Sequence, residues 1–389
     1  MLGPGGRARR KTRCDSTRRT PDPIQTARRC KAERDALTDR AQRAGLASLG
    51  PVAAPDAVLL LSFGGPEGPD DVRPFLENVT RGRGVPPERL DEVAASYHAM
   101  GGISPINAQC RRFRDALATT LTRNGHDLPV YWGNRNWHPY VDDTVAQMAA
   151  DGIQRALVFV TSAYSSYSGC RQYLEDLDGA RSAVGPSAPV FEKLRAYYDH
   201  PGFVEPLAVA GRALLGEFPA SPHLLFTAHS IPTASAATCD YEAQLAETAR
   251  LVAMRIDPEL PWSFAWQSRS GPPQVPWLEP SVDDQLTELA MAGVTDVLVV
   301  PAGFVSDHME VVWDLDHEAA ATAERLGLRM RRATTPGTAP EPAFVDLACE
   351  LIEERLDASR GRRALGALGV RPDMCPADCC PPPARPTRR

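Results

Sequence analysis

The sequence predicts an α/β protein in which two parallel β-sheets face each other across a cleft. Short apolar runs at residues 57–63, 155–161, 223–227 and 297–300 alternate with helical patterns of about 10 to 17 residues, which is typical of βαβ units. The two halves echo each other, because each begins with a strand that ends in a polar turn and later has a strand that runs into a polar loop. A length of 389 residues fits two domains of this kind.

The composition argues against several classes of protein. The formal net charge of −6 disfavours a dedicated nucleic-acid binder. No run of about 18 apolar residues is present, so we expect no membrane-spanning helix. The basic N-terminal stretch has no apolar core of the kind that a secretory signal needs. We therefore expect a cytoplasmic protein whose nine cysteines are not paired as structural disulfides.

The first half opens with residues 1–54, which are rich in Arg, Pro and Gly and which we expect to be a disordered basic extension. The Gly-Gly-Pro turn after the first strand is not a G-x-G-x-x-G fingerprint, and no Walker lysine follows it, so nucleotide binding has little support. The elements expected in this half are strands at 57–63, 130–132 and 155–161 and helices at 70–78, 107–123 and 142–150.

The second half follows a stretch at residues 187–201 that has the character of a linker. Its expected elements are strands at 223–227, 262–270 and 297–300 and helices at 203–218, 241–256, 281–292 and 342–358. After residue 361 the chain becomes rich in Arg and Pro and ends in a cluster of cysteines.

A ridge of carboxylates is predicted on the helix that follows the 297–300 strand. Glu310, Asp314 and Glu318 lie at positions i, i+4 and i+8, so all three fall on one helix face. Such a ridge can be a simple solvated acidic surface. Its place after the carboxyl end of a buried strand favours a ligand site instead, because ligands of open α/β sheets bind there.

His229 lies directly after the predicted strand at residues 223–227. A lone histidine is more often structural, but this position and the acidic ridge in the same half favour a functional role. An imidazole with a carboxylate suits Fe(II) or Mn(II), and a pair leaves coordination positions open, unlike a closed structural site. The same pair can accept protons. We expect His229 and Glu310 to meet across the gap between the two sheets.

Five segments resemble those of the ferrochelatases, and more closely the coproporphyrin III ferrochelatases of Gram-positive and actinobacterial type. They are SFGGP, MGGISPI, LLFTAHSIP, FAWQSRSGPPQVPWLEPSV and PAGFVSDHMEVVWDLD. The resemblance covers about residues 56–358. It implies two Rossmann-like domains of the chelatase type, each with a four-stranded parallel sheet, and a porphyrin cleft between them. The expected boundaries are 55–195 and 196–335, then a helix at 336–360 that packs back on the first domain and a tail at 361–389.

The resemblance also implies the reaction, which is insertion of Fe2+ into coproporphyrin III, with His229 and Glu310 binding iron as catalytic residues. Asp314 and Glu318 would guide cations inward or carry protons outward. Protoporphyrin IX remains an alternative substrate. A porphyrin or haem carrier without turnover, and a chelatase that inserts cobalt into an isobacteriochlorin, remain alternative functions. Other enzymes of haem synthesis are candidate partners.

The porphyrin contacts implied by the resemblance are Tyr97, Ser104 and Tyr173. Arg81 or Arg83 could pair with a propionate, although both would equally fit a solvated basic loop. One position departs from the family pattern. Some members have a tyrosine that ligates product iron where this chain has Phe63, and phenylalanine cannot ligate.

The cysteines form a second candidate site. Cys375, Cys379 and Cys380 follow a C-x3-C-C pattern, and Cys170 lies in the loop after the 155–161 strand. Four thiolates could bind a [2Fe–2S] cluster or zinc, and the spacing does not choose between them. The resemblance to actinobacterial ferrochelatases implies [2Fe–2S], while an unstructured cysteine-rich tail is the alternative.

Overall fold

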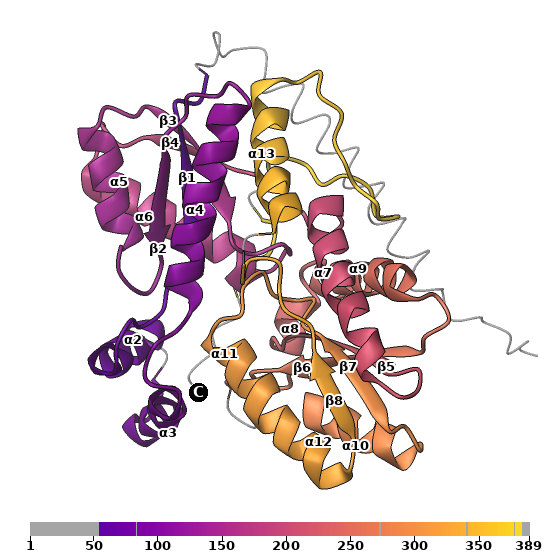
Figure 1. The fold of residues 1–389 in the computed structure, drawn as a ribbon. Coiled ribbons are helices and arrows are strands. Elements are labelled where there is room, and N and C mark those ends of the chain that lie inside the picture. The colour runs from indigo at the N-terminus through magenta and orange to yellow at the C-terminus, as the bar shows by residue number, and fades with distance from the viewer. Residues whose placement is uncertain (1–53, 83, 272–273, 340, 377, 383–389) are drawn as a thin grey trace, which may run out of the picture. The chain divides into compact units, whose positions relative to one another are not determined.

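The structure is a computed structural model that describes residues 54–382 except 83, 272–273, 340 and 377. The first sheet has four parallel strands in the order β2-β1-β3-β4 (Figure 1). Their bounds are β1 Ala57–Ser62, β2 Val130–Asn134, β3 Arg155–Val160 and β4 Val190–Lys193. Every residue of β1 is buried, as expected of a central strand that is covered on both faces.

The second sheet repeats this arrangement with the order β6-β5-β7-β8, again entirely parallel. Its strands are β5 His223–His229, β6 Trp262–Gln267, β7 Asp296–Val300 and β8 Arg329–Arg332. The predicted fold, with two four-stranded parallel sheets flanked by helices, is therefore confirmed.

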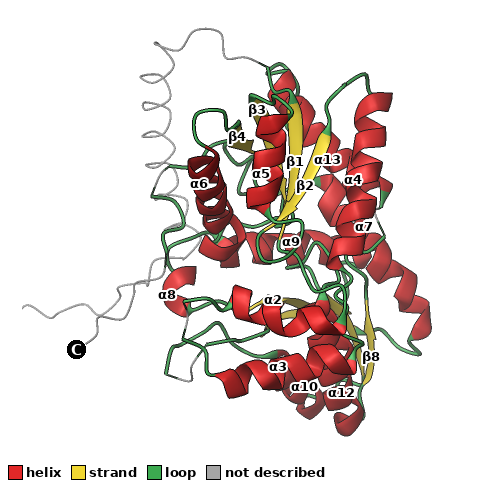
Figure 2. Ribbon diagram, turned by 90° about the vertical axis from the view of Figure 1, so that its left-hand side faces the viewer, coloured by secondary structure: helices red, strands yellow, loops and turns green. Residues whose placement is uncertain are grey.

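Helices cover both faces of each sheet (Figure 2). In the first half, α5 and α6 pack on one face and α4 on the other, where α13 joins it. In the second half, α10 and α12 pack on one face, and α7 and α9 on the other. The bounds are α2 Val72–Val79, α3 Pro87–Ala99, α4 Ile106–Arg123, α5 Val141–Ala150, α6 Gln172–Val184, α7 Pro201–Leu214, α8 Thr233–Ala236, α9 Tyr241–Ile256, α10 Val282–Met291, α11 Met309–Val311, α12 Ala320–Leu326 and α13 Pro342–Leu356.

Two of the four edge strands, β4 and β8, were missing from the expected elements. Val190–Lys193 forms β4 inside the stretch predicted as a linker, and Arg329–Arg332 forms β8. Both are four residues long, and three of the four residues of β8 are arginine. Edge strands need neither an apolar run nor a long run, because only one side is paired, and charge on them opposes edge-to-edge association.

One continuous apolar core reaches from the first sheet to the second. It contains Leu60 and Phe159 of the first sheet together with Phe226 and Val300 of the second, all fully buried. Helices α4, α7, α9 and α13 contribute most of the remaining residues, and α13 packs against α4 and α7 (Figure 1). The strand ends of both sheets are therefore held in fixed relation by shared packing.

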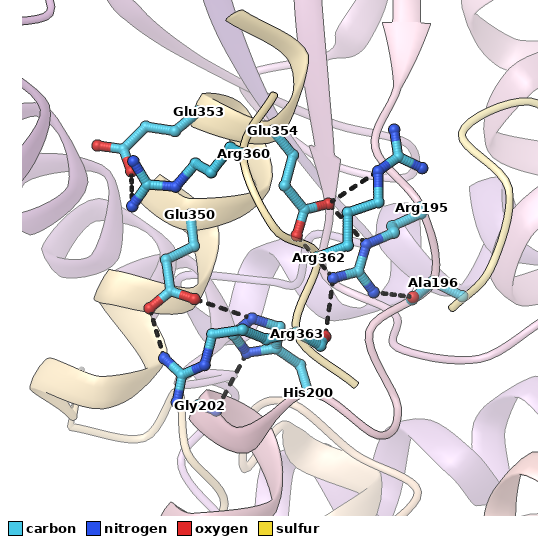
Figure 3. Close-up of polar contacts among 10 residues, drawn as sticks. All are labelled: Arg195, Ala196, His200, Gly202, Glu350, Glu353, Glu354, Arg360, Arg362 and Arg363. Carbon is cyan, nitrogen blue, oxygen red and sulfur yellow. Dashed lines mark hydrogen bonds and ion pairs between the residues drawn. The ribbon is translucent and has the colours of Figure 1, made fainter. Parts of the chain in front are cut away.

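The segment after α13 is attached to the body of the protein by polar contacts (Figure 3). Arg195, in the connection between β4 and α7, donates to both carboxylate oxygens of Glu354 on α13, each at 2.8 Å. It also donates to the carbonyl oxygen of Arg363 at 3.0 Å. Further along, the amide of Leu365 donates to the carbonyl oxygen of Asp199. No helix within the described part of the chain has the length and apolarity required to span a bilayer.

Candidate functional site

His229 is the last residue of β5, and its hydrogen bonds fix the tautomer of the ring. Nδ1 lies 2.5 Å from the carbonyl oxygen of Ser230, which can only accept, so Nδ1 carries the hydrogen. The hydroxyl of Tyr241 donates to the carbonyl oxygen of His229 at 3.0 Å and anchors its backbone. In the neutral ring, Nε2 therefore presents a lone pair, which is what a metal ligand or a proton acceptor needs.

Glu310 of α11 faces this nitrogen. Its Oε2 lies 3.7 Å from Nε2 of His229, and the two side chains are 48% and 32% exposed. Both residues come from the second half, so the expectation that they meet across the gap between the sheets was wrong. The reason is topological. Strands β5 and β7 are adjacent in the sheet, and their carboxyl ends bring the following residues to the same edge.

Asp314 is held by the end of the neighbouring strand β6. Its Oδ2 accepts hydrogen bonds from the hydroxyl of Ser268 and from Nε2 of Gln267, the latter at 3.3 Å. Burial is the main cause that raises the pKa of Asp314 to about 7, and the charges of Glu310 and Glu318 add to it, while these hydrogen bonds oppose the shift. Near neutral pH this carboxyl group can therefore take up or release a proton.

The ridge continues to Glu318, but not on a regular α-helix. After α11, residues Val312–Ala319 form a π-helix, η4, with i→i+5 hydrogen bonds. Glu318 is exposed and accepts a hydrogen bond from Nε1 of Trp313 at 2.9 Å. Because the four-residue spacing stays close to one helical turn, Glu310, Asp314 and Glu318 are electrostatic neighbours, as the charges acting on Asp314 show.

Tyr97 and Ser104, two of the predicted porphyrin contacts, are buried in the first half, and Tyr97 lies near this site. Tyr97 of α3 is buried, and its pKa is raised by burial and then by the charges of Glu310 and Asp314, so it lies near both carboxylates. Ser104 is 4% exposed and its amide donates to the carbonyl oxygen of Pro66 at 2.8 Å. A Cβ on Gly65 would lie 2.6 Å from Cβ of Ser104, so only glycine allows these two loops to pack together.

The other predicted contacts lie elsewhere. Tyr173 of α6 is buried in the apolar cluster between α5, α6 and the first sheet, and the guanidinium of Arg135 lies 4.7 Å from its ring centroid. Arg81 is exposed in the turn after α2, and Arg83 lies outside the described residues. Phe63 directly follows β1, is 37% exposed and packs edge-on against Phe75.

The structure brings the cysteines of the tail together. Sγ of Cys379 lies 3.5 Å from Sγ of Cys380, and Cys375 exchanges a hydrogen bond with Cys379. The bond to Cys375 lowers the pKa of Cys379, but the bond to Cys380, burial and the charges of Cys380 and Cys170 outweigh it and raise the pKa to about 11. Cys170 itself is buried in η2, a short π-helix at Tyr167–Arg171. The described residues contain no group of three or more His, Cys, Asp or Glu side chains placed to bind one metal ion.

Four residues of this region were not expected from the sequence: Gln267, Ser268, Asp307 and Arg332. Gln267 ends β6 beside His229 and Ser268 directly follows the strand, so the strand-end rule used for His229 could have found both. Ser268 has φ of +59°, and a non-glycine residue in that region often marks a functional position. Asp307 and Arg332 form an ion pair with an Nη1–Oδ2 distance of 3.0 Å, and no sequence pattern links these two positions.

Comparisons with known proteins identify the family. The family model described as ferrochelatase matches residues 55–356. A Nocardia farcinica protein named coproporphyrin III ferrochelatase is 52% identical over 356 residues, which cover 86% of this chain and 98% of that protein. A Mycobacterium marinum protein of the same name is 57% identical over 302 residues, covering 77% and 86%. A Rhodopirellula baltica protein named ferrochelatase is 53% identical over 329 residues, covering 84% and 93%. The chain therefore belongs to the ferrochelatase family.

Proposed function

We propose that this protein inserts Fe2+ into coproporphyrin III to give the iron porphyrin coproheme. The observation that carries the proposal is the lone pair of His229 Nε2 facing the carboxylate of Glu310 at 3.7 Å. The choice of coproporphyrin III is supported by the names of relatives that are 52% and 57% identical. Protoporphyrin IX is the alternative substrate.

The reaction exchanges two pyrrole N–H protons for one Fe2+ ion, so two protons must leave the ring. His229 can accept a proton at Nε2, and the partly exposed Glu310 can bind the arriving ion or receive a proton. Asp314, with a pKa of about 7, is suited to pass protons at neutral pH, and the exposed Glu318 extends this path toward solvent. An arriving cation also relieves the mutual repulsion of the three carboxylates.

We further propose that the porphyrin lies between the two halves. Tyr97 and Ser104 would contact the macrocycle or a propionate, and Arg81 and Arg83 would pair with propionates at the rim. Tyr173, which is buried on α6, is the remaining proposed contact. The same division implies domains at 55–195 and 196–335.

The test is a metallation assay in which zinc-free protein is given Fe2+ anaerobically with coproporphyrin III or protoporphyrin IX. We expect faster turnover of coproporphyrin III and a loss of at least about a hundredfold in H229A. His223 begins the same strand and bonds to Oγ of Ser263, so H223A is a matched control that should keep its activity. Wild-type rates in H229A would refute the role of His229. Porphyrin binding without metallation by the wild type would indicate a carrier.

We also propose that Cys170, Cys375, Cys379 and Cys380 bind a [2Fe–2S] cluster. Two thiolates on one tetrahedral metal at about 2.3 Å lie about 3.8 Å apart, close to the 3.5 Å between Sγ of Cys379 and Sγ of Cys380. Each iron of such a cluster takes only two protein thiolates, whereas zinc needs four ligands around one ion. When bound, the cluster would supply a one-electron redox centre that links the tail to η2.

The cluster proposal is tested on protein purified anaerobically, by visible absorption and acid-labile sulfide. We expect about two irons and two sulfides per chain, and their loss in C380S. C239S is the control, because Cys239 is half-buried and bonds to the carbonyl oxygen of Ser235 instead. Zinc or no metal in the wild type would contradict the proposal. A cytoplasmic location and contacts with other enzymes of haem synthesis remain predictions from the sequence.

A further inference from the structure

Arg332 is the last residue of the edge strand β8 and binds two carboxylates, those of Asp307 and Asp316. In the sequence, Asp307 precedes Glu310, and Asp316 follows Asp314. Arg332 donates from Nε and Nη2 to the two oxygens of Asp316 at 2.6 Å and 2.7 Å. Its Nη1 donates to Oδ2 of Asp307 at 3.0 Å. The side chain is only 12% exposed. A planar guanidinium that binds one carboxylate with two hydrogen bonds fixes the orientation of that carboxylate as well as its distance.

Asp307 is also fixed by groups other than Arg332. Its Oδ1 accepts from the amide of Thr335 at 3.3 Å, and its own amide donates to Oγ1 of Thr338 at 3.3 Å. Its carbonyl oxygen accepts from Nε2 of Gln109 on α4, at 3.3 Å, which is a contact with the first half of the chain. Asp307 is 5% exposed and therefore forms a rigid start to the segment that carries Glu310.

Asp316 fixes the other end of this segment. It lies two residues after Asp314 on η4, so the two side chains point to nearly opposite sides of the helix. Asp314 is turned toward Ser268 and Gln267 at the end of β6, while Asp316 is turned toward Arg332 on β8. The carboxylates that Arg332 binds are thus different from those proposed to handle iron and protons.

We infer that Arg332 is a positioning residue that holds Glu310 and Asp314 in place by fixing Asp307 and Asp316 at the two ends of their segment. The inference rests on the proposed function. Glu310 lies in a helix of three residues and is half-exposed, so its own surroundings do little to fix its distance from His229. A displacement of about 1 Å at a reacting group can lower a rate about a hundredfold.

The test compares R332K, R332Q and D316N with the wild type in anaerobic iron insertion, with porphyrin affinity measured separately by quenching of porphyrin fluorescence. Lysine offers one nitrogen and cannot bind both aspartates as arginine does, so R332K should lose about tenfold in kcat/KM for Fe2+ and R332Q about a hundredfold. D316N keeps the contact with Asp307 and should resemble R332K. Porphyrin Kd should stay within about twofold, because its proposed contacts come from the first half.

Arg331 supplies a matched control on the same strand. It points away from Arg332 and pairs on the surface with Glu217, where both side chains are almost half-exposed, so R331Q should turn over at the wild-type rate. A purely structural role predicts lower thermal stability with unchanged kcat/KM per folded molecule, and that result would overturn the inference. If R332Q does not fold, the same comparison of kcat/KM per folded molecule with thermal stability is made on D316N and R332K. Absence of iron insertion by the wild type would instead refute the proposed function.

Discussion

His200 makes the stability of this protein depend on pH in a way that can be calculated. It precedes α7, and its Nδ1 accepts a hydrogen bond from the amide of Gly202 at 3.1 Å, which caps the helix (Figure 3). Its side chain is 1% exposed. Burial, and then the cations Arg195 and Arg363, lower its pKa from 6.5 to about 3. Glu350 lies 3.2 Å from Nε2 and favours the imidazolium, but it is already paired with Arg363.

The lowered pKa sets the sign and the size of the effect. In the unfolded chain the imidazole takes up a proton below pH 6.5, whereas the folded protein keeps it neutral down to about pH 3. The unfolded state therefore binds more protons in this window, and the free energy of unfolding falls as the pH falls. Between pH 7 and pH 5 the loss is about 2 kcal/mol. The value depends little on the folded-state pKa, because pH 5 is still well above it.

The H200N variant isolates this contribution. Asparagine can accept the same bond from the amide of Gly202 and is a favoured helix cap, but it does not titrate. Urea unfolding at pH 7, 6 and 5 should show the wild type losing about 2 kcal/mol more than H200N, since all other titrating groups are common to both. Equal pH dependence of the two proteins would show that His200 takes up its proton in the folded state with the same pKa as in the unfolded chain. It would refute the assignment of a neutral imidazole.

Three further outcomes are expected from the packing. R195M leaves the buried Glu354 carboxylate without its bidentate partner and should cost about 3 to 5 kcal/mol by urea unfolding, whereas adding E354L should restore much of this loss. G65A forces a Cβ to within 2.6 Å of Ser104 and should cost about 1 to 3 kcal/mol and weaken porphyrin binding measured by fluorescence; unchanged affinity would remove Ser104 from the site. R329Q removes the ion pair between Arg329 and Asp296, in which the arginine side chain is 44% exposed. It should therefore lower the free energy of unfolding by less than R195M does in the same measurements.

The fold was predictable wherever burial leaves a pattern in the sequence. Strands β1, β3, β5 and β7 are apolar runs because they are covered on both faces, and the helices between them have clear spacing. The edge strands β2 and β6 are five and six residues long, contain apolar and aromatic residues, and were predicted. The edge strands β4 and β8 have only four residues each and carry charged side chains, so they show no such pattern. The prediction failed at these edges because hydrophobic periodicity reports burial and not hydrogen-bonded pairing.

The candidate site was predictable in its residue types but not in its geometry. Both His229 and Glu310 were singled out because they follow strand ends, and their side chains lie 3.7 Å apart. The expectation that they meet across the gap between the sheets failed, because only the adjacency of β5 and β7 shows that both residues lie at one edge of the same sheet. From the first half, Tyr97 lies close enough to Glu310 and Asp314 for their charges to raise its pKa, although burial is the larger cause.

In the acidic segment at residues 307–318, sequence spacing alone does not separate the carboxylates proposed to bind iron or protons from those that bind Arg332. Five acidic residues lie between positions 307 and 318, and a pattern of i, i+4 and i+8 selects three of them as a ridge. The remaining two, Asp307 and Asp316, share a single guanidinium that arrives from β8. That pairing neutralises two of the five acidic side chains, which lowers the repulsion acting on the three carboxyl groups of the ridge. The proposed iron site therefore depends on an arginine that no local pattern connects to it.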